Sequence, residues 1–290
     1  MQKALKQHPC FYSKAHGQYG RIHLPVAPSC NIQCAYCRRD HECLHENRPG
    51  VCAGVLTPRA ALDRLNFALT KMPYITVAGI AGPGDAFSEP DLTLRTLELI
   101  RRAYPRLSLC LSTNGLMARE HVESLKELDV GFITITVNAI NPVVGARLCK
   151  SVRIKDRMLR GIDAARVLID RQLEAIAAFK AKGFVVKVNC VVAPGFNEDH
   201  VVFIAKRMGW LGVDLMNLIP LIALPGTDMA AVEPPSASIM KTLRERAGRY
   251  VPQMRHCARC RSDAAGLLNK SNRLDAGATT SGSLKVHETS

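Results

Sequence analysis

Three cysteines lie within one short stretch of the chain, CNIQCAYC, at Cys30, Cys34 and Cys37, with the spacing C-x3-C-x2-C. Thiolates are soft ligands that select zinc or iron–sulfur clusters. A closed tetrahedral zinc site would need a fourth ligand, which Cys43 or His41 could supply. A cubane held by three cysteines instead has one iron without a protein ligand. That iron can bind the amino and carboxylate groups of a small molecule.

Composition restricts where such a site operates. The chain has 290 residues, 47% of them hydrophobic, and eleven cysteines. No apolar run approaches the roughly 20 residues that span a bilayer, and the N-terminus, MQKALKQHPC, lacks a secretory signal. We therefore expect a cytoplasmic, reducing environment and no membrane partner, so that clustered thiols are metal ligands rather than disulfides.

The formal net charge of +14 raises the question of a nucleic-acid partner. However, lysine and arginine are spread along the whole chain, and Phe, Trp and Tyr make up only 5% of it. Single-strand binding uses aromatic platforms that this composition does not provide. We expect no nucleic-acid partner, and a basic surface suits anionic cargo equally well.

Segments rich in Val, Ile and Leu alternate with amphipathic segments. The predicted strands are 22–27, 74–80, 107–112, 132–137, 184–192 and 215–222, and their near-continuous apolar runs are typical of parallel strands covered on both faces. The predicted helices are about 58–71, 91–103, 118–128, 163–182, 198–209 and 236–249. Thr57-Pro58 marks the start of the first helix, Gly183 the end of the fourth, and Asn197 a cap for the fifth.

Six β–α units in strict alternation predict an α/β fold with a parallel sheet. Eight units would close a full TIM-type barrel, so six predict a partial (β/α)6 barrel over residues 22–222 that is open on one side. A doubly wound sheet is the alternative, but no G-x-G-x-x-G follows the first strand. Residues 1–21 form an N-terminal arm, 223–268 a C-terminal segment, and 269–290 a polar, glycine-rich tail predicted to be disordered.

Polar and glycine residues follow the predicted strands, where ligands of parallel sheets bind. The turn AGPGD (81–85) ends the second strand, and its glycines allow a close approach of backbone to ligand. Short polar side chains end the next three strands: Ser112, Thr113 and Asn114, then Asn138, then Asn189. For the asparagines, turn or cap chemistry is an equally good explanation.

The cysteine loop after the first strand, together with AGPGD, resembles the radical S-adenosylmethionine (SAM) superfamily. The resemblance implies a [4Fe–4S] cluster on Cys30, Cys34 and Cys37 whose open iron binds SAM. In such proteins the cluster donates an electron to the sulfonium, and the resulting 5′-deoxyadenosyl radical abstracts hydrogen. The residues expected to contact the cofactor are Tyr36, Gly82, Gly84, Asp85, Thr113, Asn114, Asn138 and Asn189.

Further cysteines remain that a minimal radical SAM enzyme does not need. Cys257 and Cys260 form a C-x-x-C in HCARC, which predicts metal ligation in a reducing compartment. Taken by itself, Cys110 in the third strand would be a small buried hydrophobe. No partner in the sequence is evident for Cys52, Cys149 and Cys190, and we expect them to be structural.

Several segments together resemble the NifB family, the radical SAM proteins of nitrogenase cofactor assembly. They are HPC (8–10), the segment from Arg21 through the cysteine loop, ENRPGV (46–51), AGPGD, STNG (112–115), RIKDRMLRG (153–161) and HCARCRSDAAGLL (256–268). The resemblance implies two further [4Fe–4S] clusters in N- and C-terminal extensions of the barrel. One would be held by Cys10, Cys257 and Cys260, and the other by His23, Cys43 and Cys110. Three protein ligands per cluster leave labile irons, which suits cargo that is consumed and released.

The implied reaction is fusion of two clusters with insertion of a carbide from SAM, which makes the eight-iron precursor of the nitrogenase cofactor. The implied partners are iron–sulfur cluster donors and the carrier or scaffold proteins of nitrogenase assembly. This chain has LPGT (224–227) where the family usually has P-E-H-G-T, and it ends without the carrier-like domain of many members. Glu89, in the turn after AGPGD, is a candidate proton handler or a solvated carboxylate.

Three other functions fit part of the pattern. Another radical SAM maturase with auxiliary clusters would share the cysteine loop, but the histidine before that loop and the HCxxCRxDAxGLL segment argue against it. A non-catalytic iron–sulfur scaffold would need no SAM-binding turn. A zinc-ribbon protein that binds nucleic acid would contain zinc in place of iron.

Overall fold

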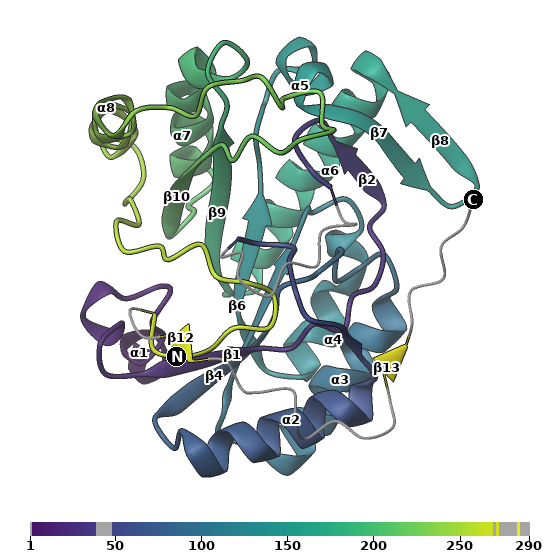
Figure 1. The fold of residues 1–290 in the computed structure, drawn as a ribbon, viewed down its shortest axis with the longest axis vertical. Coiled ribbons are helices and arrows are strands. Elements are labelled where there is room, and N and C mark those ends of the chain that lie inside the picture. Colours follow the sequence, from purple (N-terminus) through teal and green to yellow (C-terminus); the bar gives the residue numbers. More distant parts are fainter. Residues whose placement is uncertain (1, 39–47, 269–270, 273–282, 285–290) are drawn as a thin grey trace.

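The computed structural model describes residues 2–38, 48–268, 271–272 and 283–284. Six parallel strands stand side by side in chain order: β1 (Gly20–His23), β4 (Ile75–Ile80), β5 (Ser108–Thr113), β6 (Val130–Thr136), β9 (Val185–Val192) and β10 (Leu215–Pro220) (Figure 1). Each new strand adds to the same edge, so the strand order never reverses as a doubly wound sheet requires. The predicted partial (β/α)6 barrel is confirmed.

The helices between these strands match the predicted ones within a few residues. They are α2 (Pro58–Lys71), α3 (Pro90–Ala103), α4 (Val122–Glu127) after a 3-10 turn at Ala118–His121, α6 (Gly161–Ala181), α7 (Val201–Trp210) after a 3-10 turn at Glu198–His200, and α8 (Ala237–Ala247). Among the described residues, no helix combines the length and the apolar character that crossing a membrane requires.

The predicted helix boundaries have mixed outcomes. The Thr57 side chain accepts a hydrogen bond from the Ala60 amide at 3.2 Å and caps α2 as predicted. Gly183 follows α6 with φ +79°, a conformation that suits glycine. The prediction for Asn197 is wrong, because its side chain caps no helix. Its Oδ1 accepts from the Ala193 amide and its Nδ2 donates to the Asn138 carbonyl, so it braces the ends of β9 and β6.

A small second sheet was not predicted. The strand β2 (Ile32–Cys34) lies inside the cysteine loop and pairs antiparallel with β7 (Cys149–Ile154), which forms a hairpin with β8 (Arg157–Arg160). The hairpin and α5 (Pro142–Leu148) are inserted between β6 and α6. The turn gives no asparagine–glycine signal, because Lys155 itself adopts the positive φ of +52°. The stretch 153–161 that resembled the NifB family spans this hairpin.

The C-terminal segment is hydrogen-bonded to both edges of the main sheet. Beside β10, the Met216 amide donates to the Pro252 carbonyl and the Met254 amide donates to the Met216 carbonyl, both at 2.8 Å. The segment then reaches the other edge, where β11 (Ala265–Gly266) pairs antiparallel with β1. In Figure 1 this yellow-green segment runs from α8 to the neighbourhood of β1 and α1 (Gln2–Lys6). Residues 253–266 therefore run from one edge of the sheet to the other.

Four residues of the predicted tail are described. Ser271–Asn272 forms β12 beside β11, and Ser283–Leu284 forms β13 beside β3 (Val55–Leu56). The other tail positions, for which disorder was predicted, lie outside the described residues.

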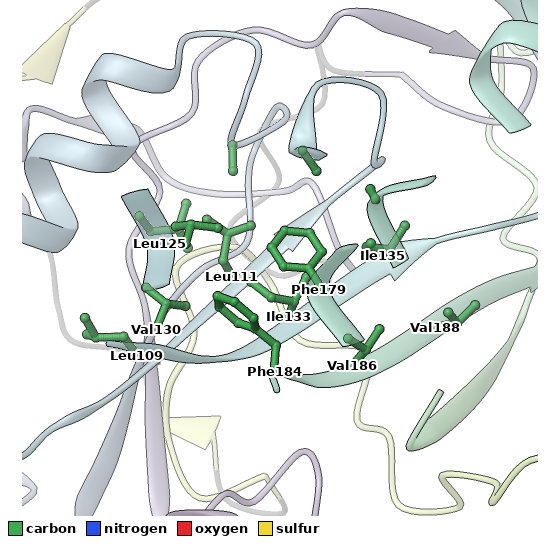
Figure 2. Packing of buried hydrophobic residues seen from close by; sticks show 14 of the residues in the cluster. Leu109, Leu111, Leu125, Val130, Ile133, Ile135, Phe179, Phe184, Val186 and Val188 are labelled. Atoms are coloured by element: carbon green, nitrogen blue, oxygen red, sulfur yellow. The ribbon is translucent and has the colours of Figure 1, made fainter. Parts of the chain in front are cut away.

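The sheet has two chemically different faces. Side chains at alternate positions of β5, β6 and β9 form the main core with helices, and Figure 2 shows Ile133 next to Phe179 of α6, and Leu109 next to Val130. The opposite face is also largely covered, but its residues are not mainly apolar. It carries polar and titratable residues that border a cavity: His23, Cys110, Ser112, Thr134, Thr136, Lys187, Asn189 and Asn217.

Phe179 tests the outer core. Its side chain is fully buried and lies edge-on to Phe184 at a centroid separation of 5.0 Å. We expect Phe179→Ala to lower the free energy of unfolding by about 3–5 kcal/mol, because it leaves a cavity that the core cannot fill. The matched control is Phe203→Ala, at a residue with 63% of its surface exposed, which should change stability by about 0.5 kcal/mol or less. Equal losses in chemical denaturation would contradict this core.

Candidate cluster and cofactor site

One cavity of ≈ 360 Å³ runs along the inner face of the half-barrel. It is bordered by the cysteine loop and AGPGD turn, by the inner positions of the strands, and by both chain ends. Eight of the nine predicted cluster ligands line it: Cys10, His23, Cys30, Cys34, Cys37, Cys110, Cys257 and Cys260. The ninth, Cys43, lies outside the described residues, as does the alternative zinc ligand His41. Ligands from widely separated segments therefore face one space.

The cysteine loop is held by backbone pairing. The Ala35 amide donates to the Leu148 carbonyl at 2.9 Å, and β2 pairs with β7. Burial, followed by the neighbouring Cys37, Cys149 and Cys30 thiols, raises the pKa of Cys34 well above its usual value. The thiol is therefore protonated at neutral pH until a metal replaces the proton.

Tyr36 connects this loop to the end of β6. Its hydroxyl accepts a hydrogen bond from Asn138 Nδ2 at 2.7 Å and shares a second hydrogen bond with the Cys34 thiol. Asn138 Oδ1 accepts from the Val191 amide at 2.8 Å. The predicted cofactor contacts Tyr36 and Asn138 thus form one chain of hydrogen bonds that orients the loop. Asn189, one strand further along, accepts from Asn217 Nδ2 at 3.2 Å.

The AGPGD turn packs directly on the backbone that leads into the cysteine loop. The Gly84 amide donates to the Ala27 carbonyl and the Asp85 amide to the Ser29 carbonyl, both at 2.7 Å. A Cβ on Gly84 would lie 1.8 Å from the Ser29 oxygen, so no residue with a side chain fits there. Gly82 has φ +118°, and a Cβ on it would lie 2.8 Å from Ser262 Oγ. Both glycines are therefore required by close approach.

Asp85 joins the ends of β4 and β5. Its carboxylate accepts hydrogen bonds from the Phe87 amide at 3.0 Å, from Thr113 Oγ1 at 3.0 Å and from the Asn114 amide at 2.5 Å. The Asn114 side chain in turn donates to Asn31 Oδ1 at 2.7 Å and lies 3.7 Å from Cys30 Sγ. Contact of Asp85 with the amino group of SAM stays a prediction, whereas its structural role is to fix Thr113 and Asn114.

Gln172 is a site residue that sequence reasoning missed. Its Nε2 donates to the Asn114 and Thr136 carbonyls, both at 2.8 Å, and it lines the cavity from α6. The available signal was its position: Gln172 is the polar residue on a helix face otherwise formed by buried Ala, Leu, Ile and Phe. A polar residue at such a position needs a hydrogen-bond partner.

Cys10 on the N-terminal arm meets Cys257 and Cys260 on the C-terminal segment. His256 Nε2 lies 3.0 Å from the Pro9 carbonyl, and Arg21 Nη2 donates to Cys260 Sγ at 2.9 Å. Burial raises the pKa of Cys10, and Cys260 and Cys257 raise it further. All three cysteines line the same cavity, although they are separated by almost the whole chain.

His23 and Cys110 flank a glycine. In the sheet register His23 pairs with Gly79, and Gly79 pairs with Cys110. A Cβ on Gly79 would lie 3.6 Å from both the Cys110 Cβ and the His23 Cδ2, so the missing side chain leaves space between the two. The His23 Nδ1 lies 3.1 Å from the Arg261 carbonyl, which leaves Nε2 for a metal. Burial and then Arg21 lower the pKa of His23 to about 4, which keeps the ring neutral, as a ligand must be.

The chemistry of the donors bears on which metal group they suit. Seven of the eight described candidate ligands are thiols and the eighth is a neutral imidazole. Soft thiolates, with an occasional histidine, are the ligands that iron–sulfur clusters take. The donor set therefore fits iron–sulfur clusters. The zinc alternative at the cysteine loop depended on Cys43 or His41, which lie outside the described residues.

The C-terminal motif docks on the SAM-side turn. Ser262 Oγ donates to the Ala81 carbonyl at 3.0 Å. Arg261 Nε donates to Asp263 Oδ1 at 2.9 Å, and Asp263 Oδ2 accepts from the Ala53 amide. Burial favours a higher pKa for Asp263, but hydrogen bonds from Arg261 and Ala53 hold it below its usual value. The RSD sequence therefore fixes the segment that carries Cys257 and Cys260.

The remaining predicted residues have structural contacts. Glu89 Oε1 accepts from Ser29 Oγ at 2.7 Å, and in LPGT the Pro225 carbonyl accepts from Arg38 Nη1 at 2.7 Å. Cys52 and Cys190 are buried and do not line the cavity, whereas Cys149 lies opposite Cys34 in the β2–β7 pair and does line it. The last position was not indicated by sequence spacing.

Comparison with known proteins supplies the class. Residues 24–208 match the Radical SAM superfamily, so the chain is a radical SAM protein. Among solved structures it is similar to Streptococcus suis SuiB bound to S-adenosylmethionine, with a TM-score of 0.57, 15% identity and coverage of 83% of this chain and 52% of that one. It is also similar to methylornithine synthase (PylB), with a TM-score of 0.54, 13% identity and coverage of 80% and 70%. These likenesses show the fold alone.

Curated relatives supply the narrower family, and each is called FeMo cofactor biosynthesis protein NifB. The relative from Chlorobaculum tepidum is 44% identical over 268 residues, covering 92% of this chain and 63% of its own. The relative from Methanocaldococcus infernus is 42% identical, covering 92% and 87%, and that from Bradyrhizobium diazoefficiens is 41% identical, covering 92% and 54%. The chain belongs to the NifB family. It spans between about half and two thirds of the length of several of these relatives.

Gly84 tests the AGPGD turn, which is predicted to lie at the SAM site. We expect Gly84→Ala to weaken SAM binding about tenfold or more in cluster-loaded protein, because displacing a packed backbone costs about 1–3 kcal/mol. Gly54→Ala is the control, since a Cβ there meets nothing within 4 Å. Equilibrium dialysis with labelled SAM measures both, and equal affinities would rule out the close approach of Gly84 to Ser29.

Proposed function

We propose that the chain is a radical SAM enzyme that fuses two [4Fe–4S] clusters and inserts a SAM-derived carbide, giving the eight-iron precursor of the nitrogenase cofactor. The observation that carries the proposal is the single cavity lined by Cys30, Cys34 and Cys37 and by ligands of both predicted accessory sets. The names of the relatives, FeMo cofactor biosynthesis protein NifB, support it. Two substrates held in one cavity with their reagent can react without leaving the protein.

The SAM end of the cavity is proposed to hold the cofactor. A cubane on Cys30, Cys34 and Cys37 supplies, when bound, the electron that cleaves SAM. Gly82 and Gly84 let the turn backbone approach the bound molecule, and Asp85 fixes the ends of β4 and β5 against the cysteine loop. Thr113, Asn114, Asn138 and Asn189 supply polar groups around it. Tyr36 orients the loop through Asn138.

The other end of the cavity is proposed to hold the substrates. One cluster binds Cys10, Cys257 and Cys260, and the other binds His23, Cys110 and Cys43. One SAM would donate its methyl group to a cluster sulfide and leave as S-adenosylhomocysteine. A second SAM, cleaved by one electron to methionine and a 5′-deoxyadenosyl radical, would lose a hydrogen atom of that methyl group to the radical, giving 5′-deoxyadenosine. Loss of the remaining hydrogens as protons would leave carbon within the fused cluster, and an external sulfur donor would supply its one added sulfur. Three protein ligands per cluster leave irons open for this joining.

The proposed cluster fusion requires partners of two kinds. Iron–sulfur cluster donors must load the two accessory sets, and carrier or scaffold proteins of nitrogenase assembly must accept the product. Both exchanges suit a cytoplasmic, reducing environment, in which thiols stay free to bind iron.

Anaerobic reconstitution with iron and sulfide tests the whole proposal. We expect about twelve irons per chain, since three [4Fe–4S] clusters carry four each. Addition of SAM and a reductant should then yield both 5′-deoxyadenosine and S-adenosylhomocysteine, measured by chromatography. If only 5′-deoxyadenosine formed, the methyl transfer would be wrong. If neither product formed, the protein would be a scaffold rather than an enzyme.

Cys257 tests which cluster accepts the methyl group. We expect Cys257→Ala to abolish S-adenosylhomocysteine formation, because the cluster on Cys10, Cys257 and Cys260 loses a ligand. Cys190→Ala is the matched control, at a cysteine buried in the outer core and away from the cavity. An unchanged yield in Cys257→Ala, measured beside the control, would refute this assignment.

A further inference from the structure

A buried lysine in the cavity is not explained by the ligands described so far. Lys187 lies on the inner face of β9, opposite Thr134 of β6 and Leu215 of β10 in the sheet register. It is only 7% exposed and lines the cavity. Its Nζ lies 4.8 Å from the centroid of the Phe11 ring. Across the described residues, no hydrogen bond or ion pair joins this ammonium to another group.

The Lys187 ammonium faces the cavity, and its described neighbours offer it a ring face but no counter-charge. The strand places it next to the predicted cluster ligands. Its three N–H donors are therefore available to an anion that enters the cavity.

The net charge of the residues that line the cavity also favours an anionic ligand. The described lining of the cavity includes four cationic residues, Arg21, Arg48, Lys187 and Arg259. Among the described residues, Asp85 is its one carboxylate. Asp85 accepts hydrogen bonds from two backbone amides and Thr113 at the SAM end. A cavity with this balance selects cargo of net negative charge.

Lys187 lies near one predicted ligand from each accessory set. Cys10 and Cys110 both pack against the cluster of Phe11, Phe132 and Val185, and Phe11 is the ring beneath the ammonium. The side chains of Cys10, Cys110 and Lys187 also all line the cavity. The ammonium therefore lies beside one predicted ligand of each accessory set.

We propose that Lys187 is a positioning residue that binds the anionic cluster cargo from between its two sites. The inference deepens the proposed function and rests on its assignment of the accessory clusters. An ammonium offers three hydrogen-bond donors, which suit cluster sulfides and thiolate sulfurs as acceptors. Thiolate-ligated clusters carry net negative charge when reduced and repel each other, so one cation between them lowers the cost of bringing them together.

Three variants test this role in protein loaded anaerobically with iron and sulfide. Lys187→Met keeps the length of the side chain and removes the charge, and Lys187→Arg keeps the charge. Lys206→Met is the control, at an exposed lysine of α7 outside the cavity. Redox titration followed by electron paramagnetic resonance gives the midpoint potential of each cluster, and SAM identifies the signal of the cluster on the cysteine loop. Iron loss to a chelator gives the rate of cluster release.

In Lys187→Met we expect the accessory clusters to have more negative midpoint potentials and to lose iron about tenfold faster, because reduction adds negative charge that no cation offsets. Lys187→Arg should retain most of the wild-type behaviour, and Lys206→Met all of it. Wild-type potentials and iron loss in a fully loaded Lys187→Met protein would overturn the proposal and leave the proposed function intact. Failure of the wild type to hold accessory clusters would instead overturn both.

The cluster-free protein gives a second readout. Lys187→Met should not lower the midpoint of chemical unfolding, because the ammonium has no hydrogen bond or ion pair among the described residues to lose, and this result also shows that the variant folds. A lower midpoint would mean that the ammonium serves the fold and would contradict the proposal. Inorganic phosphate serves as the probe for a small-anion site. If phosphate stabilised wild-type protein but not Lys187→Met, and cluster potentials were unchanged, Lys187 would bind a small anion instead of the clusters.

Discussion

Arg21, fully buried at the start of β1, ties the two ends of the chain together. Its Nη1 donates to the Gly266 carbonyl at 2.5 Å and its Nη2 to Cys260 Sγ at 2.9 Å. A half-barrel alone leaves its inner face open to water, and the thiols of the two ends would have no fixed positions. Because β11 pairs with β1 and residues 253–266 run to the β10 edge, the predicted ligands on the arm, the strands and the C-terminal segment are held around one space.

The two faces of the sheet have different roles: one packs the hydrophobic core, and the other carries the polar residues of the cavity. The outer face packs Leu, Ile, Val and Phe against the helices and needs no functional residue. The inner face places glycine, cysteine, histidine, asparagine and lysine at alternate positions of the same strands. The period of two in a strand makes this division possible, because each residue is committed to one face. The SAM-side turn and the accessory ligands then lie along one cavity without sharing side chains.

Much of the fold could be predicted from sequence, because β–α alternation and helix signals are local. The inserted β7–β8 hairpin could not, since its turn uses Lys155 at positive φ without a glycine. The role of Asn197 was misjudged because a loop asparagine can equally brace a neighbouring strand. These errors share one cause, namely that the deciding partner is distant in the chain.

Prediction of the site was limited in the same way, because most of its residues have partners that are distant in the chain. The spacing of Cys30, Cys34 and Cys37 is local and pointed to a cluster directly. The grouping of Cys10 with Cys257 and Cys260, however, came from family resemblance, since no local pattern links residues so far apart. Gln172, Cys149 and Lys187 entered the site only through the structure, because their meaning depends on what faces them across the cavity.

Gly79 determines what His23 and Cys110 can share. The two side chains stand on strands separated by the strand that carries the glycine, so their backbones are about 10 Å apart, twice the usual strand spacing. A Cβ at Gly79 would lie 3.6 Å from each of them, so a larger residue at this position would place its atoms between the imidazole and the thiol. The middle strand therefore contributes to this part of the cavity by having no side chain, and a substitution there would divide the space that the two donors face.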